Sequence, residues 1–501
     1  MLWIFLSCFF AEAESADKLI KGSFLQLPVR WGKEQWKKEF AYMTDIGIDE
    51  LIIQYVAHDT IIFYESEFTD WFTPVLETAF LDTVLQVCDS MGIDVYMGTW
   101  YYSPIFKGLY WHPDTLDTCK TRIIAIVKEV WEKFGSHSCI KGWYITPEVS
   151  YWLADPYCIS DNVGKVSRCW KEIADSCHAL TPGKLVLASP FFTLKYIDPD
   201  STYRIDHNGF AVWVDSFACL SGVDVLVMQD GVGALDHLTG GYHVDLDSVP
   251  IYYEIIKNVL DNYPDVHFWS HLEVYDKTVP PWGDTIFHAA DIERVLSQIN
   301  CESPYVEKIV CFEFRHYMEP TRVLEPWDTW GFRLKNAKLY DGYNEHFWDV
   351  RNLTSKSSYE LTPSPSSNYP DDRNKLIDTI IPPPLYDYWD DYVGWQNVDS
   401  IVVKLDLGGI DTVRNIRTYL LQDNSAEIYL PTEVKVFISP DDTNYSFIGT
   451  AKGFRPDDSL DVTVPFSWID SVYTGRWIKL VIFPGGEWTF LSEVQVFGIP
   501  G

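Results

Sequence analysis

Apolar residues in the first two thirds of the chain follow two alternating patterns. Short runs rich in β-branched and aromatic residues predict strands, and longer segments with apolar residues at i, i+3 and i+4 predict amphipathic helices. The predicted strands are Ser23–Leu27, Glu50–Ala57, Asp94–Tyr101, Gly142–Ile145, Leu185–Phe191, Val223–Gln229, Val266–Leu272 and Lys308–Phe314. The helical segments between them include Lys33–Ile46, Leu76–Met91, Leu116–Phe134, Val163–Leu180, Val249–Asn262 and Ala289–Ile299.

Glycines mark the points where two of these helices end. Gly47 and Gly92 each follow the last helical turn and directly precede a strand. Strict strand–helix alternation predicts parallel strands, and eight units in about 300 residues match the size of a (β/α)8 barrel. A doubly wound sheet is the alternative, but no glycine-rich phosphate loop follows the first strand. The sequence therefore favours an α/β fold, a (β/α)8 TIM barrel over residues 21–322.

The pattern changes after the predicted barrel. Residues 323–346 are rich in Trp and Tyr and are interpreted as a connector packed on the barrel. Residues 347–501 show no convincing helix and carry short alternating strands between Pro, Asp, Asn and Gly turns, which is typical of an all-β sandwich. The predicted strands are Ile401–Leu407, Glu433–Ser439, Trp477–Phe483 and Glu493–Gly498.

Composition limits the class of partner. The chain has 72 acidic and 39 basic residues, a formal net charge of -33, and no basic run. Nucleic acid and anionic membranes need a basic footprint, so both are excluded as partners. Aromatic residues make up 16% of the chain. This surplus suits a cleft or platform that stacks on the C–H faces of sugar rings, and an aromatic-rich core is the alternative.

The N-terminal segment, residues 1–20, predicts export. Met1–Ala13 is apolar and ends in an A-x-A cleavage pattern, and it is too short to span a membrane. Cys8 after Leu-Ser resembles a lipoprotein site. The ten cysteines include no C-x-x-C pair, so a structural zinc site is not expected, whereas disulfides stay open. Several cysteines, including Cys88, Cys177 and Cys311, are interpreted as buried apolar residues.

The C-terminal ends of barrel strands are where catalytic groups are expected. Four of these ends carry acids in surroundings rich in aromatic and amide side chains. Glycoside hydrolysis needs two such carboxyl groups, one to protonate the leaving oxygen and one to attack or to activate water. Crowded acids also raise the pKa of the proton donor, as its role requires. The residues at the strand ends are Gln26, Gln54, Tyr55, Trp100, Tyr101, Glu148, Asp230, His271, Glu273, Glu313 and His316.

The acids also have structural explanations. Glu148 could cap or pair within the loop that follows it, and Glu273 could be a solvated loop acid. Asp230 could form a tight turn, because Gly231 and Gly233 flank it.

Glu313 could form an ion pair with Arg315 or Arg322. His58 and His316 are interpreted as polar cleft or structural residues. No HExxH, paired-His or EF-hand pattern indicates a catalytic metal.

The positions of Glu148 and Glu273 resemble those of the large clan of retaining barrel glycosidases. That clan carries its acid/base glutamate after strand four and its nucleophile after strand seven. The resemblance implies those roles for Glu148 and Glu273. Pro147 stands where the clan usually has Asn.

Further motifs resemble a bacterial family of uncharacterised, glycosyl-hydrolase-like barrel domains over residues 20–320. They are G-S-F-L-Q-L, the W-x-x-E-F-x-Y-M-x-x-I-G-I-D run, L-I-I-Q-Y, Y-I-T-P-E and M-Q-D-G-V-G. The resemblance implies an exported carbohydrate-active protein. Its Q-D-G motif adds Asp230 to the expected sugar contacts.

Residues 350–499 resemble the discoidin, or coagulation-factor type C, module used for galactose-type carbohydrate binding. The matching segments include T-S-K-S-S-Y, V-V-K-L-D-L-G, L-P-T-E-V-K-V-F-I-S-P-D-D and L-S-E-V-Q-V-F-G. Many such modules hold a structural Ca2+, and the resemblance implies Asp378 and Glu493 as its ligands. The ligand loops vary, so Trp389, Trp395 and Trp488 are candidate sugar contacts that could also be packing residues.

The sequence thus predicts an exported glycoside hydrolase of oligo- or polysaccharides with an appended carbohydrate-binding module and no catalytic cofactor. In a retaining mechanism, the carboxyl groups of Glu148 and Glu273 lie about 5–5.5 Å apart, whereas inversion needs about 6.5–9.5 Å. A non-catalytic glycan-binding protein is the first alternative. A carbohydrate lyase centred on Asp230, Glu313 and His316 is the second.

Overall fold

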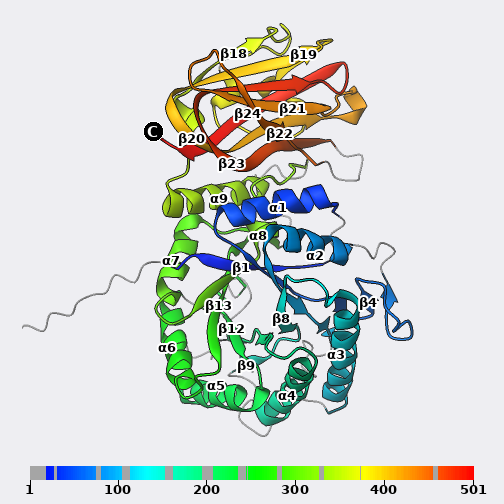
Figure 1. Ribbon diagram of the computed structural model, residues 1–501. Helices are drawn as coiled ribbons and strands as arrows, with labels where there is room; N and C mark the ends of the chain where they lie inside the picture. Colours follow the sequence, from blue (N-terminus) through cyan, green and yellow to red (C-terminus); the bar gives the residue numbers. More distant parts are fainter. Residues whose placement is uncertain are drawn as a thin grey trace, which may run out of the picture.

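The computed structural model places a closed β/α barrel beside a separate antiparallel β domain (Figure 1). It describes residues 18–27, 31–74, 80–103, 113–152, 162–193, 207–234, 244, 246–278, 285–325, 332–372, 374–454 and 461–501. The predicted export segment, including Cys8, lies outside these ranges apart from its last three residues.

Eight parallel strands close the barrel, which confirms the predicted architecture. Each strand pairs in parallel with its neighbours, and the last strand pairs with the first. The strands in chain order are β1 (Ile20–Leu25), β2 (Glu50–Ile53), β6 (Asp94–Gly98), β8 (Ile140–Ile145), β10 (Leu185–Ala188), β12 (Val225–Gln229), β13 (His267–Glu273) and β16 (Lys308–Phe312).

Helices surround the strands (Figure 1). They are α1 (Lys33–Asp45), α2 (Phe80–Met91), α3 (Pro113–Phe134), α4 (Asn162–Leu180), α5 (His207–Ser221), α6 (Val249–Leu260), α7 (Ile292–Glu302) and α9 (Phe332–Trp348), with a short α8 (Phe314–Tyr317) after the last strand. Helix α9 occupies most of the segment that was interpreted as a connector.

Several of the loops that follow the barrel strands contain short additional strands. They form three small sheets beyond the C-terminal ends of the barrel strands. Their members are β3 (Ala57–His58), β4 (Ile61–Ile62), β5 (Thr73–Pro74), β7 (Trp100–Tyr101), β9 (Ser150–Trp152), β11 (Phe191–Thr193), β14 (Tyr275–Thr278) and β15 (Ile286–Ala289).

Side-chain alternation along the strands separates two cores. One apolar cluster takes residues from all eight barrel strands and fills the interior: Phe24, Ile52, Tyr96, Tyr144, Leu187, Val225, Val227, Trp269 and Val310. The neighbours of these residues in the chain, such as Met228 and Phe268, belong to a larger cluster between the strands and the helices. Because successive side chains on a strand face opposite sides, this register fixes which residues reach the mouth.

The C-terminal domain is an antiparallel β structure with its own apolar core. Its long path runs β17-β24-β20-β23-β21-β22, while β18 pairs with β20 and β19 pairs with β24. The strands are β17 (Arg351–Asn352), β18 (Ser358–Thr362), β19 (Val393–Gln396), β20 (Ile401–Gln422), β21 (Glu433–Ser439), β22 (Ser446–Ala451), β23 (Val462–Phe483) and β24 (Trp488–Ile499).

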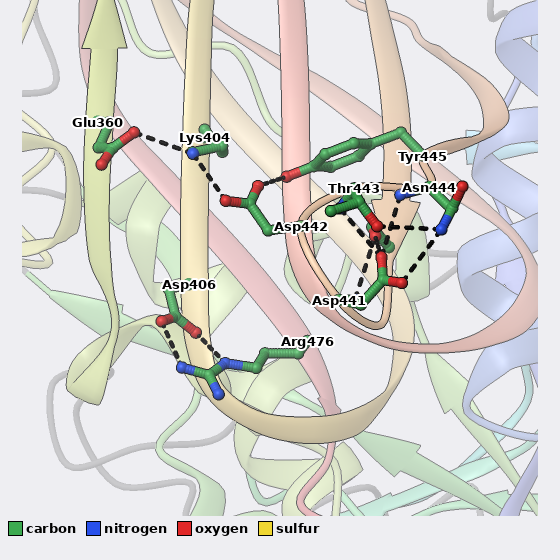
Figure 2. A network of polar contacts seen from close by, with 10 residues as sticks. Glu360, Lys404, Asp406, Asp441, Asp442, Thr443, Asn444, Tyr445 and Arg476 are labelled. Carbon is green, nitrogen blue, oxygen red and sulfur yellow. Dashed lines mark hydrogen bonds and ion pairs between the residues drawn. The ribbon is translucent and has the colours of Figure 1, made fainter.

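A polar network fixes the turn between β21 and β22 in this domain (Figure 2). Asp441 accepts hydrogen bonds from the backbone N–H groups two and three residues later, both at 3.0 Å, which is an Asx turn. Lys404 on β20 lies 3.0 Å from carboxylate oxygens of both Glu360 and Asp442. Local hydrogen bonds of this kind explain how a short D-D-T-N segment replaces regular pairing at the turn.

Ion pairs, one of them with a fully buried arginine, join the two domains along α1 and α9, which lie next to the β domain in Figure 1. Arg417 on β20 is fully buried and donates to both carboxylate oxygens of Asp341 on α9, at 2.7 and 3.1 Å. Arg414 pairs with Asp45 at 2.7 Å, and Lys452 pairs with Glu34. Bidentate arginine–carboxylate pairs have a fixed geometry, so these contacts orient the β domain on the barrel.

Two sequence expectations can be checked within the described ranges. The eight cysteines there are all free, and Cys88, Cys177 and Cys311 are fully buried as predicted. None of the helices in these ranges combines the length and the apolar character needed to cross a bilayer.

Replacing Asp341 by Ala is expected to destabilise the protein by about 3 kcal/mol, because it leaves the buried Arg417 guanidinium without its carboxylate. Asp341 itself keeps 28% side-chain exposure, which places the loss at the lower end for broken buried pairs. The measurement is urea denaturation together with calorimetric unfolding of the full chain.

Asp406→Ala is the matched control. Asp406 also forms a bidentate pair with an arginine, because it accepts two hydrogen bonds from Arg476 at 2.6 and 2.7 Å (Figure 2). That arginine, however, is 41% exposed. Solvent screening makes such a pair worth little. Equal losses in the two variants would contradict the role given to the buried pair.

Candidate active site

The mouth of the barrel is lined by the inward-facing residues that follow the interior core. Every second residue of a strand faces the same side, so the residues two or four positions after an interior core residue also face inward. After Phe24, Ile52, Leu187, Val227 and Trp269, these inward-facing positions at the C-terminal ends of the strands carry polar side chains. These are Gln26, Gln54, Ser189, Gln229, His271 and Glu273. The structure thus gathers amides, a hydroxyl, an imidazole and a carboxyl group at one end of the barrel.

Glu148 follows β8 and is partly exposed at this mouth. Burial raises the pKa of its carboxyl group to about 7, although a hydrogen bond from the Gln229 side chain opposes the shift. The Glu148 charge in turn helps raise the pKa of the Tyr101 and Tyr144 hydroxyls, after burial, so both rings lie near it. A carboxyl group with this pKa holds a proton near neutral pH and can donate it.

Glu273 ends β13 and is almost completely buried, with 3% exposure. Its Oε2 accepts a hydrogen bond from the Ala234 backbone N–H at 2.5 Å, and the Gly233 N–H also contributes. Burial raises its pKa to about 8, and the charge of Asp230 adds to the shift. The loop that carries Gly233 therefore covers this carboxyl group and fixes its orientation.

The structure corrects the expectation that Asp230 contacts sugar. Asp230 is fully buried, and by alternation it faces the helices, because its neighbour Gln229 faces the mouth. Its carboxylate accepts hydrogen bonds from the Val232 N–H at 3.1 Å and from the Gln298 side chain. Asp230 therefore holds the loop behind Glu273 and does not line the mouth.

Glu302 on α7 completes this hidden acid cluster. Burial, followed by the charge of Asp230, raises the pKa of Glu302 well above its ordinary value. Burial also raises the pKa of Asp230, although its hydrogen bonds and the charge of Arg294 oppose the shift. The two acids therefore lie together in a buried cluster behind Glu273. Arg294 donates to the backbone carbonyls of Glu273 and Tyr275, and its charge partly offsets that of Asp230.

At the end of β1, Gln26 links several candidate residues. Its side-chain amide donates to Gln54 at 2.9 Å, and its backbone N–H donates to Glu313 at 3.0 Å. The other oxygen of Glu313 pairs with His316. The expected ion pair of Glu313 with Arg315 or Arg322 does not form, because the two oxygens of the fully buried Glu313 carboxyl group bind the Gln26 N–H and His316 instead.

Aromatic side chains divide into exposed and buried groups. Tyr55, His58 and Tyr101 are partly exposed and contact one another, with the His58 and Tyr101 rings stacked at 4.5 Å. Trp100 is only 1% exposed, and its indole donates to the Asp59 carbonyl at 2.8 Å. Tyr55, His58 and Tyr101 can therefore offer a ring face to a ligand. Trp100 is instead a packing residue that holds the backbone at Asp59.

His271 lies deeper, stacked on Phe24 at 4.3 Å. Burial lowers its pKa to about 3, so the imidazole is neutral. Its Nδ1 lies 2.8 Å from the Ser189 hydroxyl, and its buried Nε2 has no hydrogen-bond partner among the described residues. The ring thus keeps one buried polar atom without a described partner beneath the mouth.

In the β domain, two of the three candidate tryptophans are partly exposed. Trp389 and Trp488 lie in an aromatic cluster with Tyr369 and Phe490, in which Trp488 stacks on Phe490 at 5.5 Å. Trp395 is instead a core residue, 1% exposed, because its indole donates to the Pro363 carbonyl at 2.9 Å. Only the first two can present a face to a ligand in this conformation.

The predicted metal ligands of this domain lie close together. Glu493 is fully buried, its Oε2 accepts from the Thr379 N–H at 3.2 Å, and its Oε1 has no hydrogen-bond partner in the described ranges. Burial and the charge of Asp378 raise the pKa of Glu493 to about 9. Glu493 Oε1 and the neighbouring Asp378 carboxyl group fit the hard oxygen ligation that Ca2+ prefers.

One other group of potential ligands, Asp89, His137 and Cys139, lies outside the mouth. Asp89 accepts hydrogen bonds there from Ser138 and from the Cys139 backbone and pairs with His137 at 2.7 Å. These contacts organise the turn between α3 and β8, which accounts for the cluster without a metal.

Sequence reasoning missed Gln229, Ser189 and Glu302. Gln229 stands in the same M-Q-D-G motif as Asp230, and strand alternation alone could have selected it. Ser189 follows a predicted strand by the same rule. Glu302 has no local signal, because a helix that is distant in sequence brings it to Asp230.

Comparison with known proteins gives a family and a fold. Residues 20–323, more than half of the chain, match the family model described as "Domain of unknown function (DUF4434)". No curated protein matches the chain.

Among solved structures, a proposed alpha-L-fucosidase from Bacteroides thetaiotaomicron is similar with a TM-score of 0.51 and 22% identity, covering 66% of this chain and 96% of that one. A second proposed fucosidase from that organism has a TM-score of 0.34 and 11% identity, with coverages of 96% and 95%. The family 32 carbohydrate-binding module of C. perfringens NanJ, solved with galactose, has a TM-score of 0.22 and 16% identity, with coverages of 30% and 98%. At these identities the first match shows the fold alone.

Asp230→Ala is expected to lower the free energy of unfolding by about 3 kcal/mol, because Glu302, Gln298 and the Val232 N–H lose a buried acceptor. Gln229→Ala should cost only about 1 kcal/mol, since it removes one partly exposed amide. Urea denaturation measures both. The reverse order of losses would contradict the assignment of Asp230 to the helix side and of Gln229 to the mouth.

Proposed function

Because the chain belongs to the DUF4434 family, whose description states no activity, we propose a function from the barrel mouth: an exported glycoside hydrolase that acts by a retaining mechanism on a poly- or oligosaccharide. Glu148 is the general acid/base and Glu273 is the nucleophile. Gln26, Gln54, Tyr55, Tyr101 and Gln229 bind the sugar.

The state of Glu148 carries this proposal. It is a partly exposed carboxyl group at the end of the fourth strand of a closed barrel, and burial holds its pKa near 7. A proton donor to a glycosidic oxygen needs such a raised pKa. Tyr101 lies near Glu148 and contacts Tyr55, and these two partly exposed rings supply stacking surfaces for a sugar.

In the proposed reaction, Glu148 protonates the leaving oxygen while Glu273 attacks the anomeric carbon and forms a glycosyl ester. Glu148 then removes a proton from water, which hydrolyses that ester. Glu273 must be ionised to attack, and the backbone N–H groups of Gly233 and Ala234 favour its anionic form. These groups oppose the effects of burial and of the Asp230 charge.

The burial of Glu273 favours the second candidate function, a glycan-binding protein that does not cleave its ligand. With 3% exposure, Glu273 offers little surface to a substrate. In that case the barrel mouth holds sugar through the same tyrosines and amides, and the β domain adds avidity. Turnover measurements distinguish the two functions.

The β domain is proposed to be a discoidin-like sandwich that binds carbohydrate through the exposed Trp389 and Trp488. The apolar segment Met1–Ala13 is proposed to export the protein, with Cys8 as a lipid-anchoring site. Export would place both domains where glycans are available.

Glu148→Gln and Glu273→Gln are each expected to reduce hydrolysis by about 10³-fold or more, because each removes a group that acts only in the transition state. Aryl fucosides, galactosides and natural oligosaccharides serve as substrates. Proton NMR of the first product anomer tests retention.

Glu360→Gln is the control, since Glu360 is 75% exposed on β18 of the β domain. Hydrolysis close to that of the wild type in either active-site variant would exclude the assignment. Saccharide binding by the wild type without any turnover would favour the binding function.

The pH dependence of kcat/KM is expected to be bell-shaped, with limbs near pH 7 and pH 8. Glu148 must be protonated, and its raised pKa of about 7 causes activity to fall as the pH rises above that value. Glu273 must be ionised, and its raised pKa of about 8 causes activity to fall as the pH drops below it. Because the pKa of the proton donor lies below that of the nucleophile, the productive form is a minor species at every pH, and its population is greatest between the two pKa values. An optimum near about pH 5, as for unshifted carboxyl groups, would contradict these roles.

We also propose that the β domain holds a structural Ca2+ through Asp378 and Glu493. Calcium at 100 times its Kd should stabilise the domain by about 2.7 kcal/mol, measured as a rise in unfolding temperature that a chelator reverses. Glu493→Gln should abolish the rise, whereas Asp399→Asn, at an exposed acid of the same domain, should retain it. A rise of equal size in both variants would contradict the site.

A further inference from the structure

A cavity of about 280 Å3 lies at the seam between the barrel and the β domain. Helix α1 contributes Lys38 and Glu39 to its wall, the segment from α8 onward contributes Arg315 and Arg322, and the β domain contributes Phe454. The cavity is distinct from the carboxyl groups proposed for catalysis. It lies close to the mouth, because Arg315 Nη1 is 3.3 Å from Nε2 of His316.

Three cations face this cavity without a salt bridge to any described residue. The Arg315 guanidinium lies over the Trp31 ring at 4.8 Å, and its buried Nε has no hydrogen-bond partner in the ranges described. Arg322 makes one long contact, 3.4 Å, to the Arg315 carbonyl. The Lys38 ammonium lies over the Phe454 ring at 5.5 Å. A fourth cation at the cavity, Arg333, is paired with Glu325 at 3.2 Å.

The acids in the wall do not bind these cations directly. Burial and the neighbouring Glu319 raise the pKa of Glu39 to about 8, and the Glu39 Oε1 has no hydrogen-bond partner among the described residues. Glu319 accepts from the backbone N–H of Thr321 at 2.9 Å and from its hydroxyl. Neither acid forms a salt bridge with Arg315 or Arg322, although the charges of Glu39 and Glu319 act on both guanidinium groups.

The clustered cations also disfavour one another. Burial, together with the charges of Arg333 and Arg315, lowers the pKa of Arg322 to about 10. Burial and the charges of Arg322 and Arg333 lower the pKa of His316 to about 3. Such a cluster is unexpected in a chain with 72 acidic and 39 basic residues. A negative charge placed among the three unpaired cations would relieve this repulsion.

We propose that the seam cavity is a binding site for a small oxyanion, a sulfate, phosphate or carboxylate group, held by Arg315, Arg322 and Lys38. Guanidinium groups bind such anions through paired N–H donors, and the ammonium group adds a point charge. The oxyanion is either a free ion or a substituent of a saccharide that extends from the mouth. The site does not depend on hydrolysis.

Calorimetric titration of the full chain with sodium sulfate, against sodium chloride at equal ionic strength, tests the proposal. One sulfate should bind per chain, and chloride should give no saturable heat. Arg322→Gln and Lys38→Gln should each weaken sulfate binding by about tenfold or more, because each removes a charged donor. Lys38 is partly exposed, so its variant keeps the test informative if Arg322→Gln does not fold.

Arg351→Gln is the matched control, since Arg351 is 54% exposed and distant from the cavity wall. It should bind sulfate like the wild type. The absence of saturable binding in the wild type, or equal affinity in all three variants, would overturn the proposal.

Titration with galactose 6-sulfate and with galactose separates the two sources of the oxyanion. Tighter binding of the sulfated sugar than of either sulfate or galactose, lost in Arg322→Gln, assigns the site to a saccharide substituent. Equal affinity for sulfate and the sulfated sugar assigns it to a free ion.

Discussion

Side-chain alternation in a closed barrel is the constraint on which the rest of this structure depends. Each strand residue faces either the interior or the helices, and the choice is fixed once the interior core is packed. Val227 faces inward, so Gln229 reaches the mouth and Asp230 is placed behind the wall. A shift by one residue would exchange these two roles. The chemistry of the mouth thus follows from the packing beneath it.

The different exposure of the acids near the mouth follows from this division between inward-facing and helix-facing residues. Glu148 is the partly exposed member, whereas Glu273, Asp230 and Glu302 form a buried series from the mouth to α7. Burial and the charge of Asp230 raise the pKa of Glu273, and burial and the charges of Asp230 and Glu273 raise that of Glu302. Asp230 therefore links the strand-end acid Glu273 to an acid on a helix.

The interface between the two domains contains both paired and unpaired arginines. Arg417 and Arg414 are matched by Asp341 and Asp45, so they hold the β domain in a fixed orientation. Arg315 and Arg322, a short distance away, have no such partners among the described residues. The paired cations at the seam orient the two domains, and the unpaired ones mark the place where a ligand can add the missing charge.

The sequence by itself determined the eight strands, most helices and the change to an all-β domain, because hydrophobic periodicity is a local property. It also selected Glu148 and Glu273, since the ends of predicted strands can be read directly. Only the tertiary structure decided that Asp230 faces away from the mouth, that Glu313 pairs with His316, and that Trp100 and Trp395 are packing residues. Those outcomes depend on the register of neighbouring strands and on partners such as Glu302, which lies 72 positions after Asp230 in the chain. Local patterns carry no information about such distant contacts.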